Sequence, residues 1–344
     1  MLKEFKGYHK GIDFGGWLSQ CDNTKERYDT FIVESDFETV SKWGVDHVRV
    51  PIDYNLVETD DGEYKEEGFK YIQNAIDWCG KYGLNMVLDL HKTYGFSFDK
   101  HYGEMGFFEN ELYQERFYKL WENLATRYSK YSDRVCFELL NEVTDAEYSD
   151  AWNRISTTCI KRIRAISKDV KILIGGYWNN SAETVKFLPN PVDENVVYNF
   201  HNYDPIVFTH QGAQWIDGMP ADLRVGVNTS FGEMKAILEK YVPQMAAGFA
   251  INGREDKVLD AEYFKQVFAE PVRIAEERGC SLYCGEYGVI ELASPEDKLA
   301  WYKCINEAFE YYGIGRATWS YKEMDFGIMN KELDGIRDEL VKLF

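Results

Sequence analysis

Short apolar runs of strand type alternate with helical patterns from one end of this 344-residue chain to the other. Such alternation is the pattern of repeated βα units. The runs are Ile12–Trp17, Val45–Val50, Leu84–Leu90, Val135–Leu140, Ile172–Gly176, Val196–Phe200, Ser281–Gly285 and Arg316–Ser320. Most are rich in Val, Ile and Leu on both faces, as in parallel strands that helices cover. Eight units of this kind predict an α/β fold, a closed (β/α)8 or TIM barrel.

Amphipathic helices are predicted between the runs. Phe69, Ile72 and Ile76 recur at steps of three and four residues, which places them on one helical face. A doubly wound open sheet is the structural alternative. It would carry a phosphate-type loop after its first strand, and residues 15–17 do not have that form. With 45% hydrophobic residues and no linker-like stretch, residues 1–344 are expected to form a single (β/α)8 catalytic domain.

The interval from His201 to Glu286 is much longer than the spacing of the other runs. Its excess, residues 204–257, holds prolines, aromatic residues and a helical pattern near Gly232 to Tyr241. We expect a small, mostly helical inserted subdomain over the barrel mouth, between strand six and the helix that follows it. In that helix, Pro271 is expected to cause a break or a kink.

The chain is strongly acidic, with 39 Lys and Arg against 58 Asp and Glu and a formal charge of −19. Such a chain is repelled by phosphate backbones and anionic lipid, so we expect no nucleic-acid and no membrane partner. No stretch approaches the roughly 20 apolar residues of a membrane span, and Met1–Lys10 lacks the apolar core of a signal peptide. We therefore expect a cytoplasmic protein, or one released without a visible signal peptide.

Cysteine and histidine usage argues against bound metals. The seven cysteines form no disulfide-like framework, which fits a reducing compartment. The stretch Cys280–Cys284 lacks zinc-site spacing, and the six histidines show no metal-type clustering. No glycine-rich phosphate loop precedes a helix. Neither a metal nor another cofactor is expected.

Functional side chains are concentrated where the predicted strands end. In a barrel of this kind the catalytic groups lie at the C-terminal ends of the strands and face one cavity. The candidate site residues at these ends are Arg49, His91, Asn141, Glu142, His201, Tyr203, Glu286 and Trp319. The sequence therefore predicts a single site to which several strands contribute.

With these motifs in this order, the sequence resembles glycoside hydrolase family 5, and within it clostridial-type endoglucanases with an insertion after strand six. The resemblance covers nearly the whole chain and rests on the Asn-Glu pair ending at Glu142 and on Gly-Glu-Tyr-Gly around Glu286. It implies that Glu142 is the acid/base and Glu286 the nucleophile. In many relatives, the histidine at the end of strand three is followed by Ala-Pro-Gly. Here His91 is followed by residues 92–95, Lys-Thr-Tyr-Gly, so sugar contacts from that loop do not carry over.

The resemblance also implies roles for the neighbouring residues. Asn141 would hydrogen-bond the sugar 2-hydroxyl, and His201 would lie beside the acid/base. His91 would contact the sugar at the cleavage site, and Trp319 would form its floor. Each of these residues could instead serve only packing or hydrogen bonding within the core.

Cleaving a glycosidic bond requires one carboxylic acid to protonate the leaving oxygen and one carboxylate to meet an oxocarbenium-like carbon. Carboxyl groups about 5–5.5 Å apart retain configuration, whereas about 6.5–9.5 Å leaves room for water and inverts it. Long Glu side chains across a barrel mouth can reach the shorter value. The charge of Glu286 and partial burial should raise the pKa of Glu142. The resemblance implies that Arg49 and Tyr203 hold Glu286, and these contacts should keep it ionised.

Other residues are interpreted from their place in the strands or from their size. Glu138 is expected inside the barrel, paired with a cation such as Arg49, and Asp89 is expected in a structural hydrogen bond. Four aromatic residues are candidate sugar platforms, with core packing as the alternative for each: Trp17, Trp178, Phe208 and Trp215.

The predicted function is a retaining endo-β-glucanase, with β-1,4-glucan or mixed-linkage β-1,3-1,4-glucan as substrate and partner. β-Mannan and β-1,3-glucan remain alternative substrates, because loops set specificity on a common barrel. A sugar-binding barrel without catalysis is a second class of function, which release of reducing sugar would exclude. A metal-dependent barrel hydrolase is a third, and no His/Asp ligand set in the sequence supports it.

Overall fold

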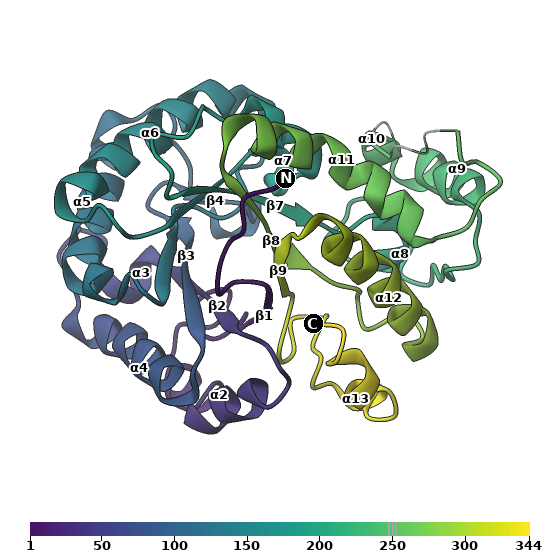
Figure 1. The fold of residues 1–344 in the computed structure, drawn as a ribbon, viewed down its shortest axis with the longest axis horizontal. Helices are drawn as coiled ribbons and strands as arrows, with labels where there is room; N and C mark the ends of the chain where they lie inside the picture. The colour runs from purple at the N-terminus through teal and green to yellow at the C-terminus, as the bar shows by residue number, and fades with distance from the viewer. Residues whose placement is uncertain (247, 250, 252) are drawn as a thin grey trace.

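A computed structural model describes residues 1–246, 248–249, 251 and 253–344. Eight parallel strands form a closed barrel, in the order β2-β1-β9-β8-β7-β6-β5-β3, with β3 pairing back to β2. The strands are β1 Lys10–Asp13, β2 His47–Asp53, β3 Asn85–Thr93, β5 Val135–Glu138, β6 Ile172–Gly175, β7 Val196–Asn202, β8 Ser281–Tyr287 and β9 Gly315–Thr318. The predicted (β/α)8 barrel is confirmed, and Figure 1 shows helices surrounding it.

Helices follow the strands around the barrel. The α-helices are α1 Lys25–Thr30, α2 Glu34–Ser41, α3 Tyr54–Val57, α4 Glu66–Tyr82, α5 Glu111–Tyr128, α6 Ser149–Ile166, α7 Tyr177–Asn180, α8 Ile206–Thr209, α9 Phe231–Tyr241, α10 Pro243–Ala246, α11 Ala261–Arg278, α12 Pro295–Tyr312 and α13 Arg337–Leu340. Short 3-10 helices are η1 Lys100–Tyr102, η2 Ser129–Tyr131, η3 Ala146–Tyr148, η4 Ala182–Phe187 and η5 Lys331–Leu333.

Local chemistry sets where the long helices begin and end. The Ser294 side chain caps the N-terminus of α12, and Pro295 occupies its first turn, where no backbone donor is lost. Helices α4 and α11 end at Gly83 and Gly279, with φ of 70° and 65°. Glycine adopts this left-handed conformation without steric cost, so each helix stops there and the chain turns into the next strand.

The predicted strands agree with the observed ones to within a few residues, except the first. The apolar run predicted at Ile12–Trp17 is a strand only as far as Asp13. Gly16 has a φ of 73°, which turns the chain, and Trp17 is instead wholly buried against the helices. The sequence also gave no sign of β4, Phe96–Ser97, which pairs antiparallel with the end of β3.

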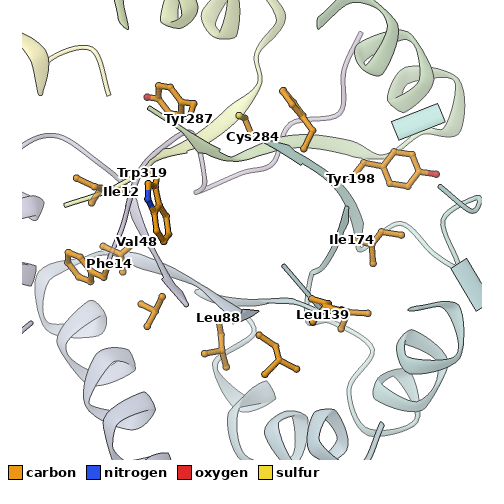
Figure 2. Packing of buried hydrophobic residues seen from close by; sticks show 14 of the residues in the cluster. Ile12, Phe14, Val48, Leu88, Leu139, Ile174, Tyr198, Cys284, Tyr287 and Trp319 are labelled. Carbon is orange, nitrogen blue, oxygen red and sulfur yellow. The ribbon is translucent and has the colours of Figure 1, made fainter. Parts of the chain in front are cut away.

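Apolar side chains fill the space between the barrel and the helices. Figure 2 shows Leu88, Ile174 and Tyr198 pointing outward from their strands. A second cluster joins two residues of the N-terminal segment to residues near the starts of six strands: Phe5, Tyr8, Val87, Cys136, Leu173, Val197, Tyr283 and Ala317. Apolar packing thus closes the N-terminal end of the barrel and leaves the polar residues at the C-terminal end.

The described residues of the range 204–257 include the helices α8, α9 and α10, which lie together at one side of the barrel in Figure 1. The helix predicted near Gly232 to Tyr241 is confirmed as α9, whose first turn is capped by Ser230 and Glu233 in a capping box. Residues 247, 250 and 252 of this range lie outside the described part of the chain. A separate subdomain over residues 204–257 remains a prediction.

Pro271 does not break α11, which runs as one helix from Ala261 to Arg278. The predicted break is absent, because the buried face of this helix packs along its length and outweighs one missing backbone hydrogen bond, and a kink at Pro271 remains a prediction. Among the described residues, no helix is both long enough and apolar enough to cross a membrane.

Candidate active site

Arg49, on β2, is the centre of a buried ion network inside the barrel. Its guanidinium nitrogens lie 2.7 Å from Glu138 Oε2, 2.8 Å from Glu286 Oε1 and 3.0 Å from Asp89 Oδ2. Asp13 Oδ1 is the fourth partner, at 3.4 Å. The expected pairing of Glu138 with Arg49 is confirmed. A fully buried guanidinium requires such partners, because an unpaired charge in the interior costs several kcal/mol.

Burial changes the protonation of the acids in this network. It raises the pKa of Asp89 to about 7 against the opposing effect of Arg49. Burial also raises the pKa of Asp13 and of Glu138, again opposed by the Arg49 charge. These carboxyl groups therefore hold protons more readily than exposed ones do, and the Arg49 charge limits that effect.

Glu286 lies near the end of β8 and is 5% exposed. Arg49 Nη1 donates to its Oε1 at 2.8 Å, and the Tyr203 hydroxyl donates to its Oε2 at 2.8 Å. Both donors stabilise the carboxylate form. Burial and the Glu286 charge raise the pKa of Tyr203, so this hydroxyl keeps the proton that it donates.

Glu142 follows β5 and is 7% exposed, with a positive φ of 40°. Its Oε2 accepts from Asn179 Nδ2 at 2.9 Å, and its Oε1 lies 2.8 Å from His201 Nδ1. Burial raises the pKa of Glu142, as expected from the sequence, and the Asn179 hydrogen bond opposes the rise. Burial lowers the pKa of His201 to about 4, so this imidazole is neutral at pH 7.

The two glutamates meet across the barrel mouth. One oxygen of Glu142, one of Glu286 and one nitrogen of His201 all lie within 4.8 Å of one another. A cation could be held by such a trio, but the Arg49 guanidinium already pairs with Glu286 and repels further positive charge. The spacing belongs to the short class in which one carboxyl group donates a proton while the other attacks carbon.

His91 and Trp319 form one wall of this site. Their rings are stacked with centroids 5.8 Å apart and planes inclined by 4°. Asp89 Oδ2 lies 2.6 Å from His91 Nδ1 and fixes the orientation of the ring, so the expected structural hydrogen bond of Asp89 is confirmed. Asn141 Oδ1 accepts from Arg49 Nη2 at 2.9 Å, whereas its Nδ2 has no hydrogen-bond partner in the described structure. That donor remains available to a ligand.

The structure brings together all eight residues that the strand ends indicated, and it adds one that the sequence analysis missed. Asn179, which donates to Glu142, lies in a run of three left-handed residues, Trp178 to Asn180, with φ between 49° and 56°. Non-glycine residues rarely adopt this conformation, and clusters of them are typical of functional sites. Only the polar pair Asn179-Asn180 after the strand at Ile172–Gly175 could have pointed to it.

The four candidate sugar platforms divide into two groups. Trp17 and Phe208 are wholly buried, so for these two residues the alternative of core packing holds. Trp17 packs between helices and its indole donates to the Tyr28 carbonyl. Trp178 and Trp215 are 51% and 49% exposed, so both remain candidate platforms.

Comparison with known proteins agrees with this geometry. The family described as Cellulase (glycosyl hydrolase family 5) matches residues 13–325. The chain belongs to glycosyl hydrolase family 5. The family that the sequence resembled is therefore confirmed, and this family 5 chain is a glycoside hydrolase.

Relatives of this family 5 chain match it along most of its length. It is 48% identical over 316 residues to Cellodextrinase A of Ruminococcus flavefaciens, covering 92% of this chain and 86% of that protein. It is 39% identical over 341 residues to Endoglucanase C of Acetivibrio thermocellus, covering 98% and 97%. The crystal structure of the clostridial cellulose synthase subunit Z from Clostridioides difficile superposes with a TM-score of 0.76 at 26% identity, covering 98% and 99%.

Proposed function

We propose that this family 5 chain is a retaining endo-β-glucanase with Glu142 as the acid/base and Glu286 as the nucleophile. The observation that carries the proposal is the approach of the two glutamates, whose oxygens lie within 4.8 Å of each other at the barrel mouth. Their surroundings differ in the required direction. Glu286 accepts from two donors that favour its charged form, while burial raises the pKa of Glu142.

In the first half of the reaction, the protonated Glu142 gives its proton to the glycosidic oxygen as the bond from that oxygen to the anomeric carbon breaks. A Glu286 oxygen forms a bond to the same carbon from the opposite face of the sugar. Arg49 and Tyr203 hold the attacking carboxylate in place, so little reorganisation is needed. The products of this step are a released sugar chain and a glycosyl ester of Glu286.

In the second half, Glu142 is ionised and accepts a proton from water as the water oxygen attacks the anomeric carbon. The bond to Glu286 breaks, and its carboxylate returns to Arg49 and Tyr203. Two inversions at the same carbon retain its configuration. Neutral His201, 2.8 Å from Glu142, supplies a hydrogen-bond partner without adding a positive charge that would lower the pKa of the acid.

The remaining wall residues are proposed to hold the sugars. The unpartnered Nδ2 of Asn141 would donate to the hydroxyl beside the reacting carbon, where a hydrogen bond strengthens as charge develops. Trp319, stacked on His91, would form the floor below the reacting ring. Half-exposed Trp178 adjoins Asn179 on the Glu142 side, where it would carry the leaving sugar.

The proposed substrates are soluble β-1,4-linked glucans, including cello-oligosaccharides, and mixed-linkage β-1,3-1,4-glucan. Relatives at 48% and 39% identity carry the names cellodextrinase and endoglucanase, which supports a glucan substrate. Aromatic floors of the kind formed by Trp319 pack the flat, all-equatorial faces of β-linked glucose units.

Replacement of the nucleophile tests the mechanism. Glu286→Ala should lower kcat on an activated aryl β-cellobioside by about 10³-fold or more with little change in thermal unfolding. Added azide should then restore turnover and release the α-configured glycosyl azide, because the small anion attacks from the vacated face. Glu277→Ala, at an exposed ion pair near the end of α11, is the matched control and should keep wild-type kcat. Wild-type turnover by Glu286→Ala would remove Glu286 from the mechanism.

A panel of polysaccharides tests the substrate. Reducing-sugar release should be fastest on barley mixed-linkage glucan and carboxymethylcellulose. Faster release from mannan or from laminarin would assign the site to a β-mannanase or a β-1,3-glucanase instead. Release from none of the four, together with measurable binding of cello-oligosaccharides, would mean a sugar-binding barrel without catalysis.

A further inference from the structure

A β-bulge at the end of β3 places an unexpected charge beside the active site. Ile52 pairs with Leu90, but the next residue of β2, Asp53, pairs with Lys92, so His91 is the extra residue of the bulge. Successive side chains of a strand point to opposite faces of the sheet. Because His91 is the extra residue, Lys92 takes the position opposite Asp53 and lies on the same face as Asp53. Lys92 and Asp53 therefore stand together at the mouth, next to His91.

Lys92 is nearly buried, at 6% exposure, and its ion pair with Asp53 is long. Its Nζ lies 3.6 Å from Asp53 Oδ2, an ion pair that is too long for a good direct hydrogen bond. The ring of Tyr102, from the loop after β4, lies 4.4 Å from the ammonium. An ammonium has three donors, and leaving them unused in a partly buried position is costly unless a ligand or water accepts from them.

Asp53 is fixed on its other side. Ser19, which follows β1, donates to Asp53 Oδ1 at 2.7 Å, and both residues are buried. The ends of β2 and β3, and the segment that follows β1, thus contribute Asp53, Lys92 and Ser19 to one polar cluster. Rigid strand ends hold polar groups more precisely than free loops do, which is what recognition of a sugar hydroxyl requires.

The cluster lies on the side of the cleavage site away from the proton donor. Glu142 leans toward β6 and β7, where it contacts Asn179 and His201, so the leaving part of the substrate lies over those strands. The retained part extends in the opposite direction, past His91, toward the ends of β1, β2 and β3. Lys92 is the neighbour of His91 in that direction.

We propose that Lys92 and Asp53 bind hydroxyl groups of the sugar unit that precedes the reacting one, and so determine the length of the retained chain. The proposal rests on the proposed glucanase function. Lys92 donates to a sugar oxygen, Asp53 accepts from a sugar hydroxyl, and Tyr102 covers the pair from the solvent side. The Lys-Thr-Tyr-Gly sequence after His91, which departs from Ala-Pro-Gly of many relatives, is the local change that provides this contact.

Aryl glycosides of increasing length test the proposal. The variants are Lys92→Met, which keeps the length of the side chain and removes its charge, and Asp53→Asn. On dinitrophenyl β-cellobioside and β-cellotrioside, we expect kcat/KM to fall about 10- to 100-fold, the cost of losing a charge-assisted hydrogen bond. On dinitrophenyl β-glucoside, which has no preceding sugar, we expect a change of less than about threefold. Lys119→Met, at an exposed position of α5, is the matched control and should behave as wild type on all three.

The pattern across substrates decides the matter. An equal loss on all three substrates would show that the pair only supports the loop, and no loss on any would show that it does not contact sugar; either result overturns the proposal. Calorimetric binding of cellotriose gives a readout without turnover, in which Lys92→Met should weaken affinity at least about tenfold. Failure of the wild type to cleave any aryl glycoside or glucan would refute the glucanase function, and the calorimetry would still test the Lys92 site.

Discussion

Burial moves the pKa values of two facing groups in opposite directions at the mouth of the barrel. Glu142 and His201 lie 2.8 Å apart, and the acid is shifted toward its protonated form while the imidazole is shifted toward its neutral form. Both shifts remove charge, as expected where water is excluded. Glu142 therefore keeps its proton to a higher pH than a free glutamate does, and it faces an imidazole that carries no positive charge at pH 7.

The pH dependence of activity should respond to Asn179. In the proposed mechanism, activity requires protonated Glu142 and is lost as pH rises through the pKa of this residue. The Asn179 amide favours the ionised form, so removing it should raise this pKa further. For Asn179→Gly, which tolerates the positive φ, we expect the alkaline limb of kcat/KM to move up by as much as about one pH unit. Asn74→Gly, at an exposed position of α4, should lower stability without moving the limb. An alkaline limb that stayed in place or moved to lower pH would contradict the assignment.

Glu142 and Glu286 could be singled out from the sequence because each follows an apolar run at its predicted C-terminal end, where barrels of this kind place catalytic groups. Arg49 and Tyr203 were identified through the resemblance, and the structure places both against Glu286. Asn179 was missed for a physical reason. Its contact depends on a left-handed run of three residues, and no residue type in that run requires such a conformation.

Among the elements, strands that are buried on both faces were predicted well from the sequence. Strand ends that depend on where the chain turns were predicted poorly. The strand at Ile172–Gly175 was predicted to within one residue. The first strand was extended too far, because apolar Phe14 and Trp17 belong to a buried loop rather than to the sheet. The bulge at His91 depends on the pairing of two distant strands and has no local signal.

Pro271 allows a test of how far packing stabilises a helix that contains a proline. A proline inside α11 leaves the carbonyl four residues earlier without its helical donor. Pro271→Ala restores that donor at the expense of some buried ring contacts, and we expect it to raise the free energy of unfolding by about 1 kcal/mol in urea denaturation. Pro295→Ala is the matched control, since Pro295 at the start of α12 replaces no helical bond and its loss should not stabilise. Equal destabilisation by both changes would show that ring packing dominates.

At the scale of the whole molecule, the two ends of the barrel have separate tasks. At the N-terminal end, the Tyr283 hydroxyl lies 2.6 Å from His47 Nε2 in a buried pair. At the C-terminal end, the Tyr203 hydroxyl donates to Glu286. In barrels of this architecture, stability is associated with the first end and catalysis with the second.

The same chemical change at the two ends should therefore have different effects. Tyr283→Phe should lower the free energy of unfolding by about 1–3 kcal/mol, because His47 loses a buried partner, and should leave kcat/KM within about twofold. Tyr203→Phe should lower kcat/KM about 10- to 100-fold on an aryl cellobioside. Thermal unfolding and initial rates on both variants check this division. A large rate loss in Tyr283→Phe with unchanged unfolding would contradict it.

Arg49 connects the two properties. Arg49 lies on β2, and its four acidic partners lie on β1, β3, β5 and β8. Side chains from more than half of the barrel strands therefore meet at one guanidinium. If the chain were cut in two between β5 and β8, the first fragment would keep Arg49 with three of its acidic partners, and the second would keep Glu286 without its cation. Neither half could hold its share of the site alone, and hydrolysis would return only when the fragments reassembled around that single cation.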